Sequence, residues 1–358
     1  MKILLFSRYS HLGASSRLRM LQYLPYFREN GIEVKVHHLL DDRYLKTLYD
    51  KKKRVLNTIF LAYLGRLFQL LKSKQYDLLW IEKELFPMLP AWFEQLIRFL
   101  GIPYVVDYDD AVFHNYDLHP NKWVRKILGM KIDRVMKNSS LVVAGNDYLA
   151  TRARRAGATQ VEIFPTVIDI NRYQLAQKES DFFFTVGWIG SLSTAEYLLD
   201  IRSALVEIGK SDKTMLCIVG AKDVEIQGIT TQEKIWTEKT EVNDISSFDI
   251  GIMPLRNNSW DRGKCGYKLI QYMACGKPVV ASPVGVNNQI VEHGVNGFLA
   301  ETELEWIEAL RTLRDNPELR AKMGAAARKK VIEKYTIQKI SPELLSQMRQ
   351  VKNKSHLR

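Results

Sequence analysis

Three basic side chains surround a glycine-bearing loop in the second half of the chain. Arg262, Lys264 and Lys268 lie in the stretch 262–285, where the loop leads into an expected helix at 267–274 and then a buried strand. Unpaired amide groups at a helix N-terminus, together with the helix dipole, attract anions, and three full positive charges strengthen that attraction. A diphosphate is the natural ligand of this arrangement. The alternative is an ordinary α/β loop whose lysines are merely solvated.

A cluster of carboxylates follows an expected strand in the first half, in the sequence Asp107-Tyr-Asp-Asp110. It has three interpretations: an Asp-x-Asp metal motif, a cap for the following helix, or part of a reaction centre. We favour the third, in which Asp109 or Asp110 orients or deprotonates an acceptor hydroxyl and stabilises developing positive charge. We therefore expect no metal site.

Small and polar residues between the first expected strand and helix form a second candidate site, in the sequence Gly13-Ala-Ser-Ser-Arg17. Small residues are needed where backbone approaches a ligand closely, although a structural turn is nearly as good an interpretation for each residue alone. The end of another strand, at Glu82 and the two residues after it, offers weaker candidates. The predicted acceptor or cleft residues are Gly13, Ser15, Ser16, Arg17 and Glu82.

The candidate residues named above follow expected strands, so they can lie close together only if the fold places the ends of these strands at one edge of a sheet. Short apolar, β-branched runs alternate with longer helical patterns, which predicts α/β architecture with parallel sheets. A helix is expected from about Ser15, capped by Ser15 or Ser16, to Gly31, with apolar residues at helical spacing. Expected strands are 2–6, 33–37, 77–81, 104–107, 141–144, 182–189, 215–219, 249–253 and 278–281.

The length of 358 residues predicts two domains. The stretch 164–169 separates the two sets of strands, so we place one domain at 1–167 and another at 168–335, followed by a terminal helix at 336–358. The beginning of the chain is too briefly apolar for a signal peptide, and no run is long enough for a membrane span. Cys217, Cys265 and Cys275 have neither metal-ligand nor disulfide spacing, which suits a reducing cytoplasm.

The charge is uneven along the chain. Residues 1–168 hold 26 Lys and Arg against 16 Asp and Glu, a net of +10 out of the total of +12. Such a surface attracts membrane headgroups, a lipid-linked phosphate or nucleic acid. No aromatic–basic recognition motif accompanies the charge, so we do not expect nucleic-acid binding.

Two apolar helical patterns in this basic half suit an anionic membrane surface. The basic residues 51–54 lead into 55–71, which has a wide apolar face and a narrow stripe of Thr58, Ala62, Arg66 and Gln69; residues 88–100 follow with several aromatics. Such helices can lie on a membrane. The alternative, packing against the first domain's sheet, is at least as good for either segment alone.

The motif around Lys268 resembles the donor site of the retaining glycosyltransferases of family 4, in the sequence Met273-Ala-Cys-Gly-Lys-Pro-Val-Val280. The resemblance continues through 285–299, and further parts resemble the family at 5–19, 165–169 and 186–191. It implies the GT-B fold, with two Rossmann-like domains whose parallel sheets face an interdomain cleft. The resemblance makes 1–167 the acceptor-binding domain and 168–335 the nucleotide-sugar-binding domain, and the terminal helix at 336–358 is expected to cross back to the first domain. The resemblance places the donor nucleotide at Gly190, Ser191, Arg262, Lys264, Gly266, Tyr267, Lys268 and Gln271.

Two departures from the family pattern fall in this site. Gly263 and Gln271 stand where the family usually has two glutamates, and Ser191 and Glu196 replace its Arg and Lys. Gln271 can still form hydrogen bonds with ribose hydroxyls. We expect Lys264 and Lys268 to neutralise the diphosphate instead.

The resemblance implies sugar transfer with retention, with catalytic roles for Asp109, Asp110, Lys264 and Lys268 and without a cofactor. The expected donor is a nucleotide-diphosphate sugar, and the expected acceptor is a glycan or lipid-linked molecule in cell-surface polysaccharide or lipopolysaccharide synthesis. The protein is expected to be cytoplasmic and peripheral at the inner face of the membrane. The alternatives are a catalytically silent GT-B binding module and a nucleotide-sugar epimerase of the same architecture.

Overall fold

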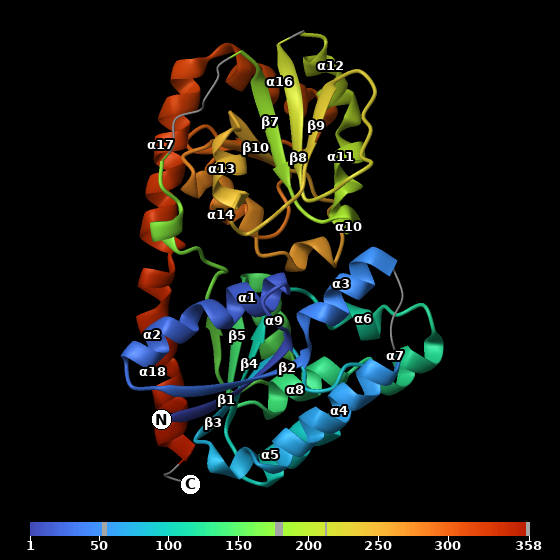
Figure 1. Cartoon of the computed structure of the whole chain (residues 1–358), viewed down its shortest axis with the longest axis vertical. Helices are drawn as coiled ribbons and strands as arrows, with labels where there is room; N and C mark the ends of the chain where they lie inside the picture. Colours follow the sequence, from blue (N-terminus) through green and yellow to red (C-terminus); the bar gives the residue numbers. More distant parts are fainter. Residues whose placement is uncertain (52–55, 176–181, 212, 356–358) are drawn as a thin grey trace. The chain divides into compact units, whose positions relative to one another are not determined.

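The computed structural model describes residues 1–51, 56–175, 182–211 and 213–355, so the basic residues 52–54 of the predicted membrane segment lie outside it. The described residues form two compact units, each built on a six-stranded parallel sheet covered by helices (Figure 1). Unit 1 comprises Met1–Thr166, Gly263–Cys265 and Ile340–Arg358, and unit 2 comprises Val167–Arg262 and Gly266–Lys339. The predicted α/β class is confirmed.

The sheet of unit 1 has the strand order β2-β1-β3-β4-β5-β6. Its inner strands are apolar and buried because helices cover both faces, as is usual for parallel sheets. The strands are β1 (Lys2–Tyr9), β2 (Glu33–Leu40), β3 (Leu78–Glu82), β4 (Tyr104–Tyr108), β5 (Leu141–Ala144) and β6 (Val161–Ile163).

Helices of unit 1 connect successive strands and pack their apolar sides on the sheet. One core cluster joins strand residues such as Leu79 and Val106 to Leu70, Ile97 and Leu149 of three different helices, which therefore share a face of the sheet. The helices are α1 (Ala14–Arg19), α2 (Leu24–Glu29), α3 (Asp42–Lys51), α4 (Leu56–Leu71), α5 (Trp92–Phe99), α6 (His114–Asp117), α7 (Lys122–Leu128), α8 (Lys131–Asn138), α9 (Asp147–Arg155) and α18 (Ile337–Ser355), which enters unit 1 at Ile340.

The prediction of one helix after β1 is wrong. The chain instead forms α1, a 3-10 turn at Leu21–Tyr23, and α2. Pro25 stands in the first turn of α2, where its missing N–H cannot continue a preceding helix, so the helix restarts there. The predicted serine cap is also wrong, because Gly13 is the N-cap of α1 and makes no side-chain bond.

The sheet of unit 2 has the order β12-β11-β10-β7-β8-β9. Its strands are β7 (Phe184–Ile189), β8 (Thr214–Val219), β9 (Thr230–Lys234), β10 (Ile250–Met253), β11 (Val279–Ala281) and β12 (Gly297–Leu299). Its helices are α10 (Leu192–Ala195), α11 (Tyr197–Asp200), α12 (Arg202–Gly209), α13 (Glu241–Ser246), α14 (Tyr267–Ala274), α15 (Asn287–Ile290), α16 (Glu303–Asp315) and α17 (Pro317–Lys334). No helix in the described part of the chain has the length and apolar character needed to cross a membrane.

Candidate functional site

Lys268, on the first turn of α14, is held by residues at the end of β7 and in α10, which follows it. Its ammonium lies 4.1 Å from the centroid of the Trp188 ring and 3.3 Å from the Thr194 hydroxyl. A Cβ at Gly190 would stand 2.6 Å from the ammonium, so the glycine leaves space for the lysine. The N-cap Gly266 adopts a left-handed φ of 65°, which brings the loop to the helix start. Unit 2 thus places a cation, carried by the first turn of α14, against the end of β7 and the start of α10.

The other predicted donor residues of unit 2 lie in different surroundings. Ser191 is the N-cap residue of α10, and its exposed hydroxyl lies 2.9 Å from that of Ser193. Arg262 donates from Nε to Asn257 Oδ1 at 2.9 Å. The structure therefore brings Gly190 and Lys268 together, whereas the contact shown for the Arg262 guanidinium is with another loop residue.

Gln271 belongs to a buried hydrogen-bonded group in unit 2. Its amide nitrogen lies 3.4 Å from the Tyr173 hydroxyl, which donates to Glu241 at 2.8 Å. Trp236 donates to the other carboxylate oxygen of Glu241 at 2.8 Å. Tyr267, also a predicted donor residue, is partly buried against the same core. Gln271 is only 3% exposed, so its side chain is fixed by the protein itself.

Asp109 of unit 1 forms an ion pair with a lysine that follows the neighbouring strand. Lys83 Nζ lies 2.9 Å from the Asp109 carboxylate and donates to the Ser15 hydroxyl at 3.0 Å. Lys83 has a φ of 64°, which is unfavourable for a lysine and typical of functional positions. Burial opposes ionisation of Asp109, but the charge and hydrogen bond of Lys83, together with Ser15 and Arg19, outweigh it, so the pKa of Asp109 is lowered. Asp109 is therefore an anion at neutral pH.

Asp110 pairs with Lys264 within unit 1. Lys264 Nζ lies 3.2 Å from the Asp110 carboxylate, and both side chains are about one quarter exposed, at 23% and 25%. Burial raises the pKa of Asp110 against the attraction of Lys264 and Lys83. Neighbouring carboxylates with opposite pKa shifts are a common feature of acid–base sites.

The loop Gly263–Cys265 is anchored in unit 1 by Asn146. The Asn146 amide nitrogen lies 3.0 Å from both the Gly263 and Lys264 carbonyl oxygens. Cys265 is 8% exposed and belongs to the unit 1 core. A Cβ at Gly263 would stand 2.5 Å from the Ala111 Cβ. This close approach gives a physical reason for the glycine at the first family glutamate position.

Gly263→Ala is expected to lower the free energy of unfolding by about 1–3 kcal/mol, because the added methyl group overpacks the contact with Ala111. Urea unfolding measures this change. Gly65→Ala is the matched control: apart from its chain neighbours and the backbone of α4 itself, no described atom lies within 4 Å of a Cβ added there. It is expected to stabilise the protein by about 0.5–1 kcal/mol. Equal effects of the two substitutions would contradict the close packing of Gly263.

The predicted acceptor residues of unit 1 also come together. Glu82 is buried, and one of its carboxylate oxygens accepts hydrogen bonds from the Ser16 hydroxyl at 2.6 Å and the Arg8 amide at 2.7 Å. Gly13 is close-packed, since a Cβ there would stand 2.4 Å from that of Tyr9. Arg17 donates to the His11 carbonyl at 2.7 Å. Glu82 therefore ties the ends of β1 and β3 to α1.

Sequence reasoning missed two residues of this site. Asn146 was not identified, and Lys83 was considered only as a weak acceptor ligand. Nothing in the sequence indicates that the loop Gly263–Cys265 is hydrogen-bonded to Asn146. For Lys83 the signal was its place after a strand adjacent to β4, where a lysine can reach the carboxylates.

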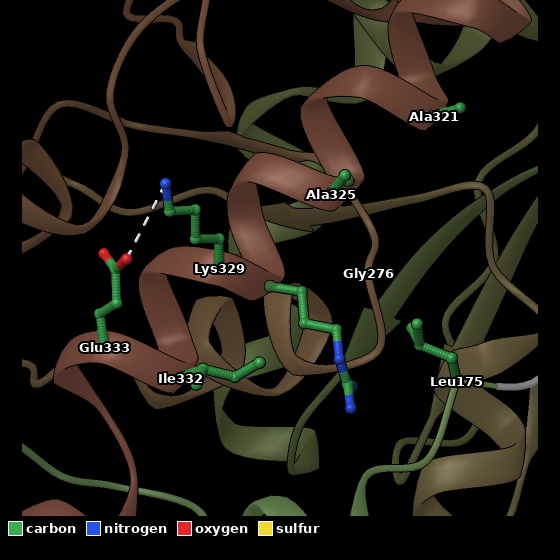
Figure 2. A pocket seen from close by; sticks show the side chains of 9 residues that line it. Leu175, Gly276, Ala321, Ala325, Lys329, Ile332 and Glu333 are labelled. Atoms are coloured by element: carbon green, nitrogen blue, oxygen red, sulfur yellow. Dashed lines mark ion pairs between the residues drawn. The ribbon is translucent and has the colours of Figure 1, made fainter.

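A cavity of about 500 Å³ lies elsewhere in unit 2, on α17 (Figure 2). Its lining includes Leu175, Gly276, Ala325, Lys329 and Ile332. None of the predicted donor residues lines it. Within the described ranges, no group of three or more His, Cys, Asp or Glu is placed to hold a metal ion, and the predicted metal-free site stays a prediction.

The arrangement of two six-stranded parallel sheets is that of known sugar-transferring enzymes. The fold is similar to that of Anabaena HepE in complex with UDP, with a TM-score of 0.71 and 18% identity over 98% of this chain and 100% of that one. Sucrose-phosphate synthase from Thermosynechococcus elongatus gives a TM-score of 0.71 at 14% identity, covering 98% of each chain. The chain therefore has the GT-B fold.

The family match covers most of unit 2 and the loop Gly263–Cys265 of unit 1. Residues 183–316 match the model of the family described as glycosyl transferases group 1. A D-inositol 3-phosphate glycosyltransferase from Pseudarthrobacter chlorophenolicus is 31% identical over 107 residues, or 29% of this chain and 24% of that protein. The N-acetyl-alpha-D-glucosaminyl L-malate synthase of Bacillus anthracis is 36% identical over 78 residues, or 21% of this chain and 20% of that protein. These alignments span about a quarter or less of the two relatives.

Proposed function

We propose that this protein is a metal-independent hexosyltransferase that moves a sugar from a nucleotide-diphosphate sugar to a glycan or lipid-linked acceptor, with retention of configuration. The observation that carries the proposal is Lys268, held beside Gly190 at the start of α14. A cation on the first turn of a helix, where the helix dipole is positive, stabilises the diphosphate that departs in sugar transfer. The match of 183–316 to glycosyl transferases group 1 supports the same function.

In this proposal Asp109 acts on the acceptor side. Its lowered pKa keeps it ionised beside Lys83, so it can orient an acceptor hydroxyl and stabilise positive charge on the sugar. Lys264 takes part in neutralising the diphosphate. The basic first half of the chain favours an anionic or lipid-linked acceptor at the inner face of the cytoplasmic membrane, in the synthesis of a cell-surface polysaccharide.

The donor site can be tested before any acceptor is known, by thermal unfolding with nucleotides. Because HepE was solved with UDP, UDP is the first ligand to test. At about 100 times its Kd, UDP is expected to raise Tm by roughly 5–10 °C, since it binds only the folded protein. UMP, which lacks the second phosphate, should have a smaller effect.

The control compares UDP with GDP, ADP and the corresponding monophosphates. If no nucleoside diphosphate raises Tm, the proposed enzyme is wrong. Binding of UDP without turnover of any UDP-sugar would instead favour a silent binding module, which the absence of both family glutamates, at Gly263 and Gln271, also favours. Conversion of the donor without an acceptor would favour an epimerase.

A further inference from the structure

Helix α4 exposes its apolar residues and buries its only charge. The exposed side carries Phe60, Leu61, Leu64 and Phe68, whose side chains are between 47% and 66% exposed. Arg66, the only charged residue between Leu56 and Leu71, is 1% exposed. A helix on the surface of a globular protein normally has the opposite polarity.

Helix α5 repeats this inverted pattern. Trp92, Leu96 and Phe99 lie at helical spacing and are between 47% and 87% exposed, whereas Glu94 is 1% exposed. Both buried charges bind the backbone of the same residue: Arg66 donates to the Leu85 carbonyl at 3.1 Å, and Glu94 accepts from the Leu85 amide at 2.9 Å. The inward position of the two charges is therefore fixed by specific bonds.

Helices α4 and α5 both pack on the same core cluster of unit 1. Leu70 of α4 and Ile97 of α5 belong to one core cluster on one face of the sheet. Tyr63 of α4 and Phe93 of α5 both contact the Phe86 ring, with centroid distances of 5.4 Å and 4.4 Å. The sides that do not pack on this core form the apolar face, which comprises Leu56, Phe60, Leu61, Leu64, Phe68, Leu71, Trp92, Leu96 and Phe99.

The exposed charges of the segment that carries the apolar face are positive. Between residues 56 and 100 the exposed charged residues are Lys72, Lys74 and Arg98, and Asp77 is half-buried. The three glutamates of this segment are buried. Lys72 Nζ lies 4.4 Å from the centroid of the Phe68 ring, at the edge of the face. Aromatic and aliphatic residues bordered by lysines suit the headgroup region of an anionic bilayer.

We propose that the apolar face of α4 and α5 docks unit 1 on an anionic lipid bilayer, with both helices parallel to the surface. A second copy of the chain fits less well, because a symmetric dimer places the same patch against itself and brings Lys72 and Lys74 near their own copies. This inference deepens the membrane association proposed above by naming the contact face, and it can be tested without any sugar nucleotide.

Co-sedimentation of the full chain with phosphatidylglycerol vesicles tests the proposal. Phe68→Glu is expected to weaken binding about tenfold or more, because it places a carboxylate in the apolar contact. The matched control is Leu304→Glu, since Leu304 is a 76% exposed leucine of unit 2. Lys72→Glu with Lys74→Glu should weaken binding to phosphatidylglycerol vesicles without changing the weaker binding to phosphatidylcholine.

A site-specific probe can show which residues enter the lipid. The three native cysteines are at most 8% exposed, so a thiol introduced by Phe68→Cys can be labelled selectively with an environment-sensitive fluorophore. Its emission should shift to the blue on addition of phosphatidylglycerol vesicles, and Leu304→Cys should show no shift.

Failure of the wild-type chain to bind phosphatidylglycerol vesicles would overturn the proposal, as would equal loss of binding in Phe68→Glu and Leu304→Glu. A concentration-dependent dimer that Phe68→Glu dissociates, without vesicle binding, would assign the face to a second copy instead. Unchanged thermal unfolding of Phe68→Glu confirms that the variant is folded, as expected for an exposed position.

Discussion

Lys268→Ala is expected to lower kcat for sugar transfer by about 10²–10³-fold, because the leaving diphosphate loses a positioned cation. The loss should exceed that of a surface charge, since Trp188, Thr194 and Gly190 fix the ammonium at the helix N-terminus. Steady-state kinetics with a UDP-sugar measures the change. UDP binding, followed by thermal shift, should weaken as well.

Lys210→Ala is the control for this prediction. Lys210 is a 69% exposed lysine of unit 2, and it forms an ion pair with Glu207, three residues earlier in the chain. The substitution should leave kcat unchanged. Lys264→Ala should also reduce turnover, by removing the second cation assigned to the diphosphate. Wild-type rates in both Lys264→Ala and Lys268→Ala would refute the lysine-based donor site.

Asp107→Ala is expected to lower the free energy of unfolding by about 3–5 kcal/mol, because it leaves a buried guanidinium without its carboxylate. Arg19 Nε lies 2.8 Å from Asp107, and both side chains are 2% exposed. Arg19 also donates to the Phe164 carbonyl at 2.7 Å, so it cannot turn to solvent without losing that bond. Urea unfolding measures the loss.

The exposed pair Lys2–Glu33 provides the comparison, at 3.5 Å with side chains 60% and 67% exposed. Glu33→Ala should change stability by no more than about 0.5 kcal/mol, because water screens such a pair. Combining Arg19→Leu with Asp107→Leu should recover part of the loss caused by Asp107→Ala. A loss no greater for Asp107→Ala than for Glu33→Ala would contradict the assigned role of burial.

The central strands of both sheets could be predicted because strands buried on two faces are continuous apolar runs, as in β3 and β5. The strands that the sequence analysis missed are β6, β9 and β12, and all three lie at sheet edges. β9, in the sequence Thr-Thr-Gln-Glu-Lys, is largely polar because one side of an edge strand faces solvent. Such a pattern resembles a loop.

The helical pattern of 55–71 was recognised from the sequence, but the sequence could not show which side of the helix packs against the sheet. Arg66 faces inward because carbonyl oxygens of Ser7, His37 and Leu85, all distant in sequence, converge on its guanidinium. In the candidate site, too, a contact between residues distant in sequence could not be predicted. Lys83 and Asp109 were both noted, yet their ion pair depends on the left-handed backbone at Lys83, which nothing in the sequence indicates.

Unit 1 is formed by segments that are distant in sequence, and this affects the order in which the protein folds during synthesis. Residues Met1–Thr166 are synthesised before the rest of the unit, which also needs Gly263–Cys265, with Cys265 in its core, and α18 from Ile340 onward. Gln347 and Arg349 of that helix bond to Gln160 and Asn30. Unit 1 therefore cannot complete its packing until α18 has been synthesised, and its incomplete core is exposed to aggregation in the meantime.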